Sequence, residues 1–96
     1  MRRFYLVSYD ISDNKRRGKV AKFLEGWGDR VQYSVFCCQL NEREKLRLCS
    51  EIKKFLNEKE DQIIVVDAGN ADGQHPLPEL VYLGRPWKPE ERCQII

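Results

Sequence analysis

Asp10 is the side chain whose position in this sequence most directly offers chemistry. It follows the apolar segment 3–9 (RFYLVSY), where a strand would end, so a sheet would present its carboxylate at one edge. One carboxylate is a poor metal site, but a residue near the two-fold axis of a symmetric dimer meets its own copy. Two carboxylates about 4 Å apart repel by roughly 4 kcal/mol at an effective dielectric constant near 20. A shared proton or a hard cation would relieve this repulsion, and Mg²⁺ suits such a site. The alternative is that Asp10 only caps the following loop or helix, and its position alone leaves both interpretations open.

A cluster of positive charge lies shortly after this strand. It consists of Lys15, Arg16, Arg17 and Lys19, with Lys22 further along. Arginine binds phosphate oxygens through two parallel hydrogen bonds, and clustered positive charge is typical of sequence-independent binding to nucleic acids. An ordinary solvated helix face is the alternative, and charge alone does not decide between them.

The remaining reactive side chains favour structural roles. Aromatic rings that would otherwise stack on bases are interpreted as core residues, namely Tyr5, Tyr9, Trp27, Tyr33 and Phe36. His75 has no partner at metal-ligand spacing, and Asp67 and Asp72 are expected in turns. The four cysteines contain no Cys-x-x-Cys pair, so we expect reduced thiols and neither a zinc site nor a disulfide scaffold.

The composition is that of one globular domain. The chain has 96 residues, 42% hydrophobic and 33% charged, which excludes a multidomain enzyme and intrinsic disorder. The net charge is only +2, so nucleic-acid binding would depend on local clusters of charge. No apolar run approaches the roughly 20 residues that span a bilayer, so we expect a cytoplasmic protein with no membrane partner.

The patterning predicts four strands and two helices that would position these residues. After the first strand, a helix begins at Lys15 and is ended by Gly26 and Gly28, and Gly18 weakens its interior. Residues 30–40 (RVQYSVFCCQL) alternate between apolar and polar and predict one long strand. A capping pattern at Asn41 then starts a second helix that runs to about Glu58.

Two more strands are predicted in the second half of the chain. Residues 61–68 contain four consecutive apolar residues, which indicate burial on both faces, and residues 79–83 form the other strand. The resulting order, βαβαββ, lacks the β–β step of the ferredoxin-like βαββαβ order. Either order gives an α+β domain with a four-stranded sheet and two helices on one face. Residues 1–84 would form this domain, and residues 85–96 a tail that pairs as a strand with a partner subunit.

The N-terminal region resembles the CRISPR-associated Cas-two family, small partners of the spacer-acquisition integrase. The resemblance rests on Tyr9, Asp10 and Ile11 at a strand end, on Asp13, Asn14 and Arg17, and on the run QYSVF at residues 32–36. The family has a ferredoxin-like sandwich. This implies that the βαβαββ order is wrong and that the second and third strands are joined through residues assigned above to a helix.

The resemblance also implies an activity, a metal and partners. Family members are described as metal-dependent endonucleases on single-stranded RNA or double-stranded DNA, and as homodimers in which two copies of Asp10 bind Mg²⁺ or Mn²⁺. Positions associated with activity correspond to Tyr9, Asp10, Arg17, Arg30 and Phe36. Lys19 keeps the charge of a second basic position but lacks the paired hydrogen bonds of arginine. In spacer acquisition the dimer binds the DNA to be inserted and bridges two integrase dimers, which does not need cleavage.

An alternative function remains open. Related small proteins of the same fold are toxin-like endoribonucleases that act without a CRISPR partner. A neighbouring integrase gene would argue against this alternative.

Overall fold

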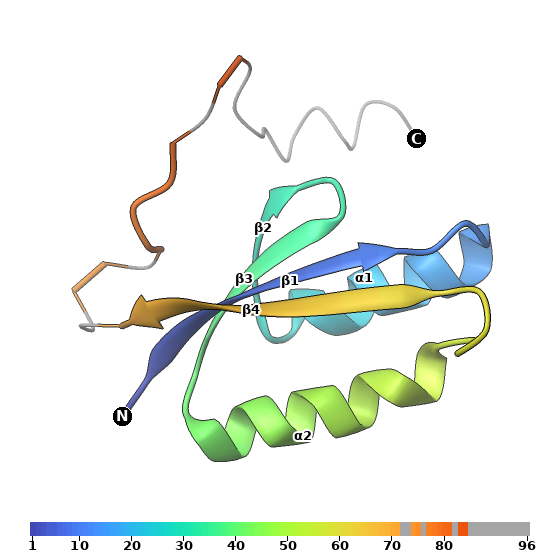
Figure 1. The fold of residues 1–96 in the computed structure, drawn as a ribbon, viewed down its shortest axis with the longest axis horizontal. Helices are drawn as coiled ribbons and strands as arrows, with labels where there is room; N and C mark the ends of the chain where they lie inside the picture. Colours follow the sequence, from blue (N-terminus) through green and yellow to red (C-terminus); the bar gives the residue numbers. More distant parts are fainter. Residues whose placement is uncertain (72–73, 76, 82, 85–96) are drawn as a thin grey trace.

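The chain folds as a βαββαβ unit in the computed structural model, which describes residues 1–71, 74–75, 77–81 and 83–84. Its elements are β1 (Arg3–Asp10), α1 (Asn14–Glu25), β2 (Gly28–Gln32), β3 (Val35–Leu40), α2 (Glu42–Ile52), the 3₁₀ helix η1 (Lys53–Phe55) and β4 (Gln62–Asn70). The strands form one antiparallel sheet in the order β2-β3-β1-β4 (Figure 1). The ferredoxin-like sandwich that the resemblance implied is therefore confirmed.

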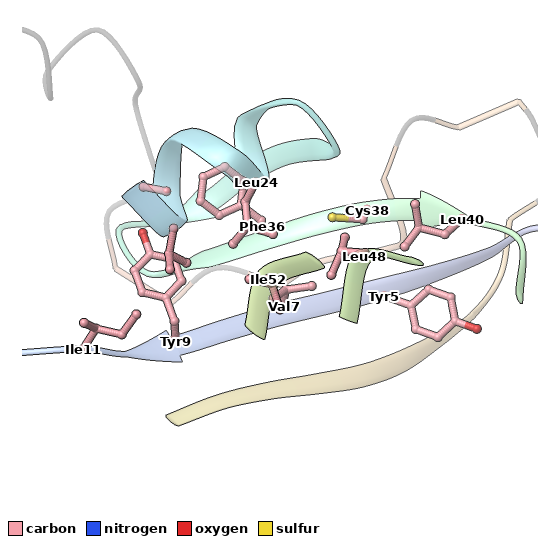
Figure 2. Packing of buried hydrophobic residues seen from close by; sticks show 12 residues of the cluster. Tyr5, Val7, Tyr9, Ile11, Leu24, Phe36, Cys38, Leu40, Leu48 and Ile52 are labelled. Atoms are coloured by element: carbon pink, nitrogen blue, oxygen red, sulfur yellow. The ribbon is translucent and has the colours of Figure 1, made fainter. Parts of the chain in front are cut away.

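The two faces of the sheet are covered differently. Because side chains alternate along a strand, β1 directs Tyr5, Val7 and Tyr9 toward one face. There they pack with buried residues of both helices, including Leu24 of α1 and Leu48 of α2 (Figure 2). The opposite face is called the outer face here.

The outer face carries the other residues of β1 and a smaller buried cluster. Phe4, Val31 and Cys37 form this cluster, and the segment around Leu77 and Leu80 packs against it. Among the described residues, no helix contributes to this cluster, so the two helices cover one face of the sheet, and the described part of the chain covers the outer face at one end.

Residues 30–40 form a hairpin, so the prediction of one long strand is wrong. β2 ends at Gln32 and β3 begins at Val35, which places the β–β step inside this region and not in a segment assigned to a helix. Arg30 pairs with Phe36, and Phe36 faces the helices. Val31 and Cys37 face the outer face instead, and the register shifts between Arg30 and Gln32, where Gln32 pairs with Val35. The shift lets two short strands follow an alternation that looks continuous in the sequence.

The second helix is shorter than predicted. It ends at Ile52 and continues only as η1 to Phe55, because Leu56 has an extended backbone. Asn57 then starts a turn in which its backbone N–H donates to the carboxylate of Asp61. The chain has therefore left the helix before Glu58.

The prediction that residues 61–68 are buried on both faces is also wrong. β4 is at the edge of the sheet, and its outward side chains Ile64 and Val66 are 49% and 46% exposed. The expected strand at 79–83 is not formed by its described residues, which have no regular structure. The tail at 85–96 lies outside the described residues. In the part of the chain that the structure describes, no helix has the length and apolar character needed to cross a membrane.

Candidate nucleic-acid and metal site

Asp10 ends β1 on the outer face, and its side chain is exposed. The strand pairing places Leu6 beside Val66 and Ser8 beside Ile64 on the same face, and Val35 of β3 pairs with Ser8 from the other side. The outer apolar patch is defined as Leu6, Val35, Ile64 and Val66. Asp10 therefore lies at the border of an apolar surface that is partly open to solvent.

The donors for a metal are few in a single chain. Within the described residues, no group of three or more His, Cys, Asp and Glu side chains could hold a metal ion. Asp10 thus offers one carboxylate per chain, and a second copy of the chain would add a second one, which together are the number that Mg²⁺ commonly takes from protein beside its water ligands.

Three predicted site residues meet on the helix-covered face and not beside Asp10. Tyr9 and Phe36 are buried, with ring centroids 6.4 Å apart. The guanidinium carbon of Arg30 lies 4.8 Å from the centre of the Phe36 ring, and Nη2 of Arg30 donates to the Tyr9 hydroxyl at 3.4 Å. Neighbours in a strand point to opposite faces, so Tyr9 and Asp10 are separated by the sheet.

This group of three holds the turn of the β2–β3 hairpin. The Tyr9 hydroxyl donates to the carbonyl oxygen of Tyr33 at 3.1 Å, and the Tyr9 backbone N–H donates to that of Ser34 at 3.0 Å. The turn is thus attached to the residue that directly precedes Asp10. In this structure Tyr9, Arg30 and Phe36 position the surroundings of Asp10.

Arg17 holds the loop between Asp10 and α1. Its Nη1 donates to the carbonyl oxygens of Ile11 at 2.9 Å and Ser12 at 3.2 Å, and its Nη2 donates to the side chain of Asn14. Since these acceptors belong to the loop itself, the guanidinium fixes the direction in which the chain leaves Asp10.

Arg16 is engaged in an ion pair with a buried carboxylate. Its Nε and Nη2 donate to the two carboxylate oxygens of Asp61 at 2.8 and 3.1 Å, and Nη2 also donates to Glu60 at 3.1 Å. The Asp61 side chain has no exposed surface. The hydrogen bond from Arg16, followed by that from the Asn57 backbone, holds the pKa of Asp61 below its usual value. The pair joins the first turn of α1 to the loop before β4.

The four predicted nucleic-acid-binding residues therefore differ in accessibility. Lys15 and Lys19 are exposed on α1, whereas Arg16 and Arg17 are half-buried and donate hydrogen bonds within the chain. The two lysines have the more accessible charges for a phosphate backbone.

Two surface features were missed by sequence reasoning. Tyr33, interpreted as a core residue, is 57% exposed, whereas Tyr5, Tyr9 and Phe36 are buried as expected. The sequence QYSVF contains one turn-favouring residue, Ser34, and no Gly, Pro, Asn or Asp, so its composition did not distinguish a hairpin turn from a continuous strand. The outer apolar patch was also missed, although the apolar run Ile63–Val66 would have indicated it had β4 been placed at the edge.

Three curated proteins illustrate the similarity to known sequences. The CRISPR-associated endonuclease Cas2 2 of Thermus thermophilus is 42% identical, covering 82% of this chain and 91% of that protein. The CRISPR-associated endoribonuclease Cas2 of Geobacter sulfurreducens is 30% identical over 100% of this chain and 99% of that protein. The alignment with the endoribonuclease Cas2 3 of Synechocystis sp. is 44% identical but covers only 62% of this chain and 64% of that protein.

Solved structures share the fold. The hypothetical protein TT1823 of Thermus thermophilus superposes with a TM-score of 0.77 at 32% identity, over 92% of this chain and 98% of that chain. Cas2 of Streptococcus pyogenes gives a TM-score of 0.62 at 32% identity, over 66% of this chain and 82% of that chain. A chain of a partial Cas6-RT-Cas1–Cas2 complex gives 0.58 at 22% identity, over 81% of this chain and 99% of that chain, which shows the fold alone.

The family assignment rests on a long match. Residues 1–74 match the family described as CRISPR associated protein Cas2, and this range includes β1 to β4 and every predicted site residue. The protein therefore belongs to the CRISPR-associated Cas2 family.

Proposed function

We propose that this chain acts in CRISPR adaptation as a homodimer that binds double-stranded DNA and bridges the spacer-acquisition integrase. We further propose that a pair of Asp10 carboxylates is the centre of a metal-dependent endonuclease. The observation that carries the proposal is the position of exposed Asp10 at the border of the outer apolar patch. Membership of the Cas2 family supports the CRISPR role, and relatives named endonuclease and endoribonuclease support cleavage of DNA or RNA.

The outer apolar patch supports the homodimer. Ile64 and Val66 are about half exposed, and contiguous apolar surface of this kind marks interaction sites. A two-fold dimer uses the same surface of both copies, so burying this patch would bring its borders together. Asp10 would then approach its own copy in the partner subunit.

Such a dimer would supply a donor set that suits a hard cation. Mg²⁺ binds through one or two carboxylates, keeps water ligands and accepts phosphate oxygens, and the two Asp10 side chains would hold it. When bound, the ion would stabilise negative charge on the phosphoryl oxygens during hydrolysis. Arg17 would keep the loop after Asp10 in place, and Lys15 and Lys19 would neutralise backbone phosphates.

The nuclease is tested with Asp10→Asn and a matched control, Asp29→Asn, which removes another exposed carboxylate from the same face. Cleavage of single-stranded RNA and double-stranded DNA is measured with Mg²⁺, with Mn²⁺ and with a chelator, and binding is measured in the same samples. We expect the wild type and Asp29→Asn to cleave only with metal, and Asp10→Asn to bind without cleaving. Cleavage by Asp10→Asn at the wild-type rate would exclude Asp10 as the centre.

The dimer and the bridging role are tested separately. Ile64→Lys places a charge in the outer apolar patch, whereas Leu46→Lys places the same charge at a 60% exposed residue of α2. Light scattering should show a dimer for the wild type and Leu46→Lys, and a monomer without cleavage for Ile64→Lys. The Asp10→Asn dimer, which does not cleave, should still form a complex with the CRISPR integrase in size-exclusion chromatography. Failure to form this complex would contradict an adaptor role that is independent of cleavage.

A further inference from the structure

The tip of the β2–β3 hairpin presents an aromatic ring to solvent. Tyr33 is 57% exposed, whereas Tyr5 and Tyr9 are 6% and 4% exposed. The tip lies at the end of the sheet where β1 leads into α1 (Figure 1). The position of Tyr33 is therefore unlike that of a ring placed to fill the core.

Hydrogen bonds attach this tip to β1. The Tyr9 backbone N–H donates to the carbonyl oxygen of Ser34 at 3.0 Å, and the Tyr9 hydroxyl donates to that of Tyr33 at 3.1 Å. Tyr9 directly precedes Asp10 in the chain. The backbone that carries the exposed ring is thus attached to the residue that precedes Asp10, whose own side chain points to the other face of the sheet.

A cationic side chain also orients the ring. The guanidinium carbon of Arg30 lies 5.8 Å from the centre of the Tyr33 ring, within the range of a cation–π interaction. Arg30 is in turn held over the buried ring of Phe36 at 4.8 Å. The interaction restrains the Tyr33 ring while more than half of the side chain stays accessible, so a planar ligand would meet a pre-oriented surface.

We propose that Tyr33 is a stacking site for an unpaired nucleobase of a nucleic acid bound near Asp10, an inference that rests on the proposed function. Single-stranded nucleic acids bind by stacking successive bases on aromatic rings, and every base has a face that can stack. Bases inside a duplex already stack on their neighbours and do not need such a ring. The site would therefore favour single-stranded RNA, or frayed and unpaired ends, over a continuous duplex.

The test compares Tyr33→Ala and Tyr33→Trp with the control Leu46→Ala, which truncates another exposed apolar side chain, on helix α2 and outside the hairpin. The probes are an unstructured RNA oligonucleotide, the same oligonucleotide with an abasic segment, and a blunt DNA duplex. Quenching of 2-aminopurine in the RNA reports stacking directly. Circular dichroism and urea denaturation of each variant report folding.

Removing the ring should selectively weaken binding to unpaired bases. Tyr33→Ala should lower the affinity for the RNA about 5- to 150-fold and abolish the quenching, while Tyr33→Trp retains both. The abasic oligonucleotide and the blunt duplex should bind equally to the wild type and Tyr33→Ala, and Leu46→Ala should match the wild type throughout.

Other outcomes separate this inference from the proposed function. Unchanged RNA affinity in Tyr33→Ala, or equal losses of affinity for RNA and duplex, would overturn the stacking site, whereas the proposal that the wild type binds duplex DNA would stand. A wild type that binds duplex but not single strands would do the same. A wild type that binds neither would overturn both proposals. Loss of integrase association with unchanged RNA binding would identify the tip as a protein-docking surface and refute stacking.

Discussion

Replacing Gly28 with alanine tests the hairpin that brings Arg30 and Phe36 together. A Cβ at residue 28 would lie 2.2 Å from the carbonyl oxygen of Cys37 and 2.8 Å from Sγ of Cys38. Ordinary contact begins at 3.4 Å. Because the nearest atom belongs to the backbone of the paired strand β3, side-chain rotation does not relieve the overlap, and the two strands must separate by about 1 Å.

The expected cost follows from the packing around this residue. Adding a methyl group to a well-packed interior typically costs about 1–3 kcal/mol. Gly28 pairs with Cys38, whose side chain is completely buried, so the surroundings have little room to adjust. Alanine lowers the entropy of the unfolded chain, a gain of about 0.4–1 kcal/mol that offsets only part of this cost. Taking the upper end of the packing cost and subtracting this gain, we expect Gly28→Ala to lose about 2 kcal/mol of unfolding free energy.

Urea denaturation followed by far-UV circular dichroism, at one fixed chain concentration, measures this loss. Gly18→Ala is the matched control, because the residue is inside α1 and its Cβ would meet no atom within 4 Å apart from its chain neighbours and the backbone of its own helix. There alanine should stabilise the helix by about 1 kcal/mol. The two identical substitutions should therefore shift the midpoint in opposite directions. Wild-type stability in Gly28→Ala, or a shift of the same sign in both variants, would refute the strand packing described here.

Three further predictions concern the buried groups. Asp61→Asn removes a carboxylate whose pKa is lowered by Arg16, so above about pH 4 the wild type should be more stable than the variant. This advantage should disappear as the pH falls through the folded-state pKa of Asp61. Thermal unfolding of both proteins across the acid range checks this, and a stability difference that does not change with pH would contradict it. Phe36→Ala removes a fully buried ring and should cost about 3–5 kcal/mol in urea denaturation, whereas a loss below about 1 kcal/mol would show that the ring is not in the core. Burial raises the pKa of the Cys38 thiol to about 12, so iodoacetamide at mildly alkaline pH should leave Cys38 unmodified while half-buried Cys49 reacts. Mass spectrometry of the labelled protein measures both, and rapid labelling of Cys38 in the folded protein would disprove its burial.

Elements with local signals were predicted well. The first strand and the first helix lie where the patterning placed them, and Asp13 caps α1 by accepting a hydrogen bond from the Arg16 backbone. Asn41 and Glu44 form the reciprocal capping box at α2, with both hydrogen bonds at 2.8 Å. Each of these caps depends on residues within one helical turn of each other, so all the groups that form the cap can be recognised in a short stretch of sequence.

The candidate site was predicted as one set of residues and is divided in the structure. Asp10 lies on the outer face, whereas Tyr9, Arg30 and Phe36 meet on the other. The alternation of strand side chains separates Tyr9 from Asp10, which the sequence could indicate. The approach of Arg30 to Tyr9 depends on the hairpin and on the pairing of β3 with β1, and the sequence could not indicate this approach. Similarly, the engagement of Arg16 depends on a loop that is 45 residues away in the chain.

The local elements, their caps, the family resemblance and the position of a carboxylate at a strand end could all be recognised in the amino-acid sequence. Long-range packing sets where residues 30–40 turn, makes β4 an edge strand, and exposes Ile64 and Val66 while the Asp61 side chain keeps no exposed surface. The physical reason is that propensities, caps and side-chain alternation act between residues close in the chain. Strand order and burial instead depend on which distant segments lie side by side. The same apolar run can occur in a central strand and in an edge strand with one uncovered face, so the run does not distinguish them.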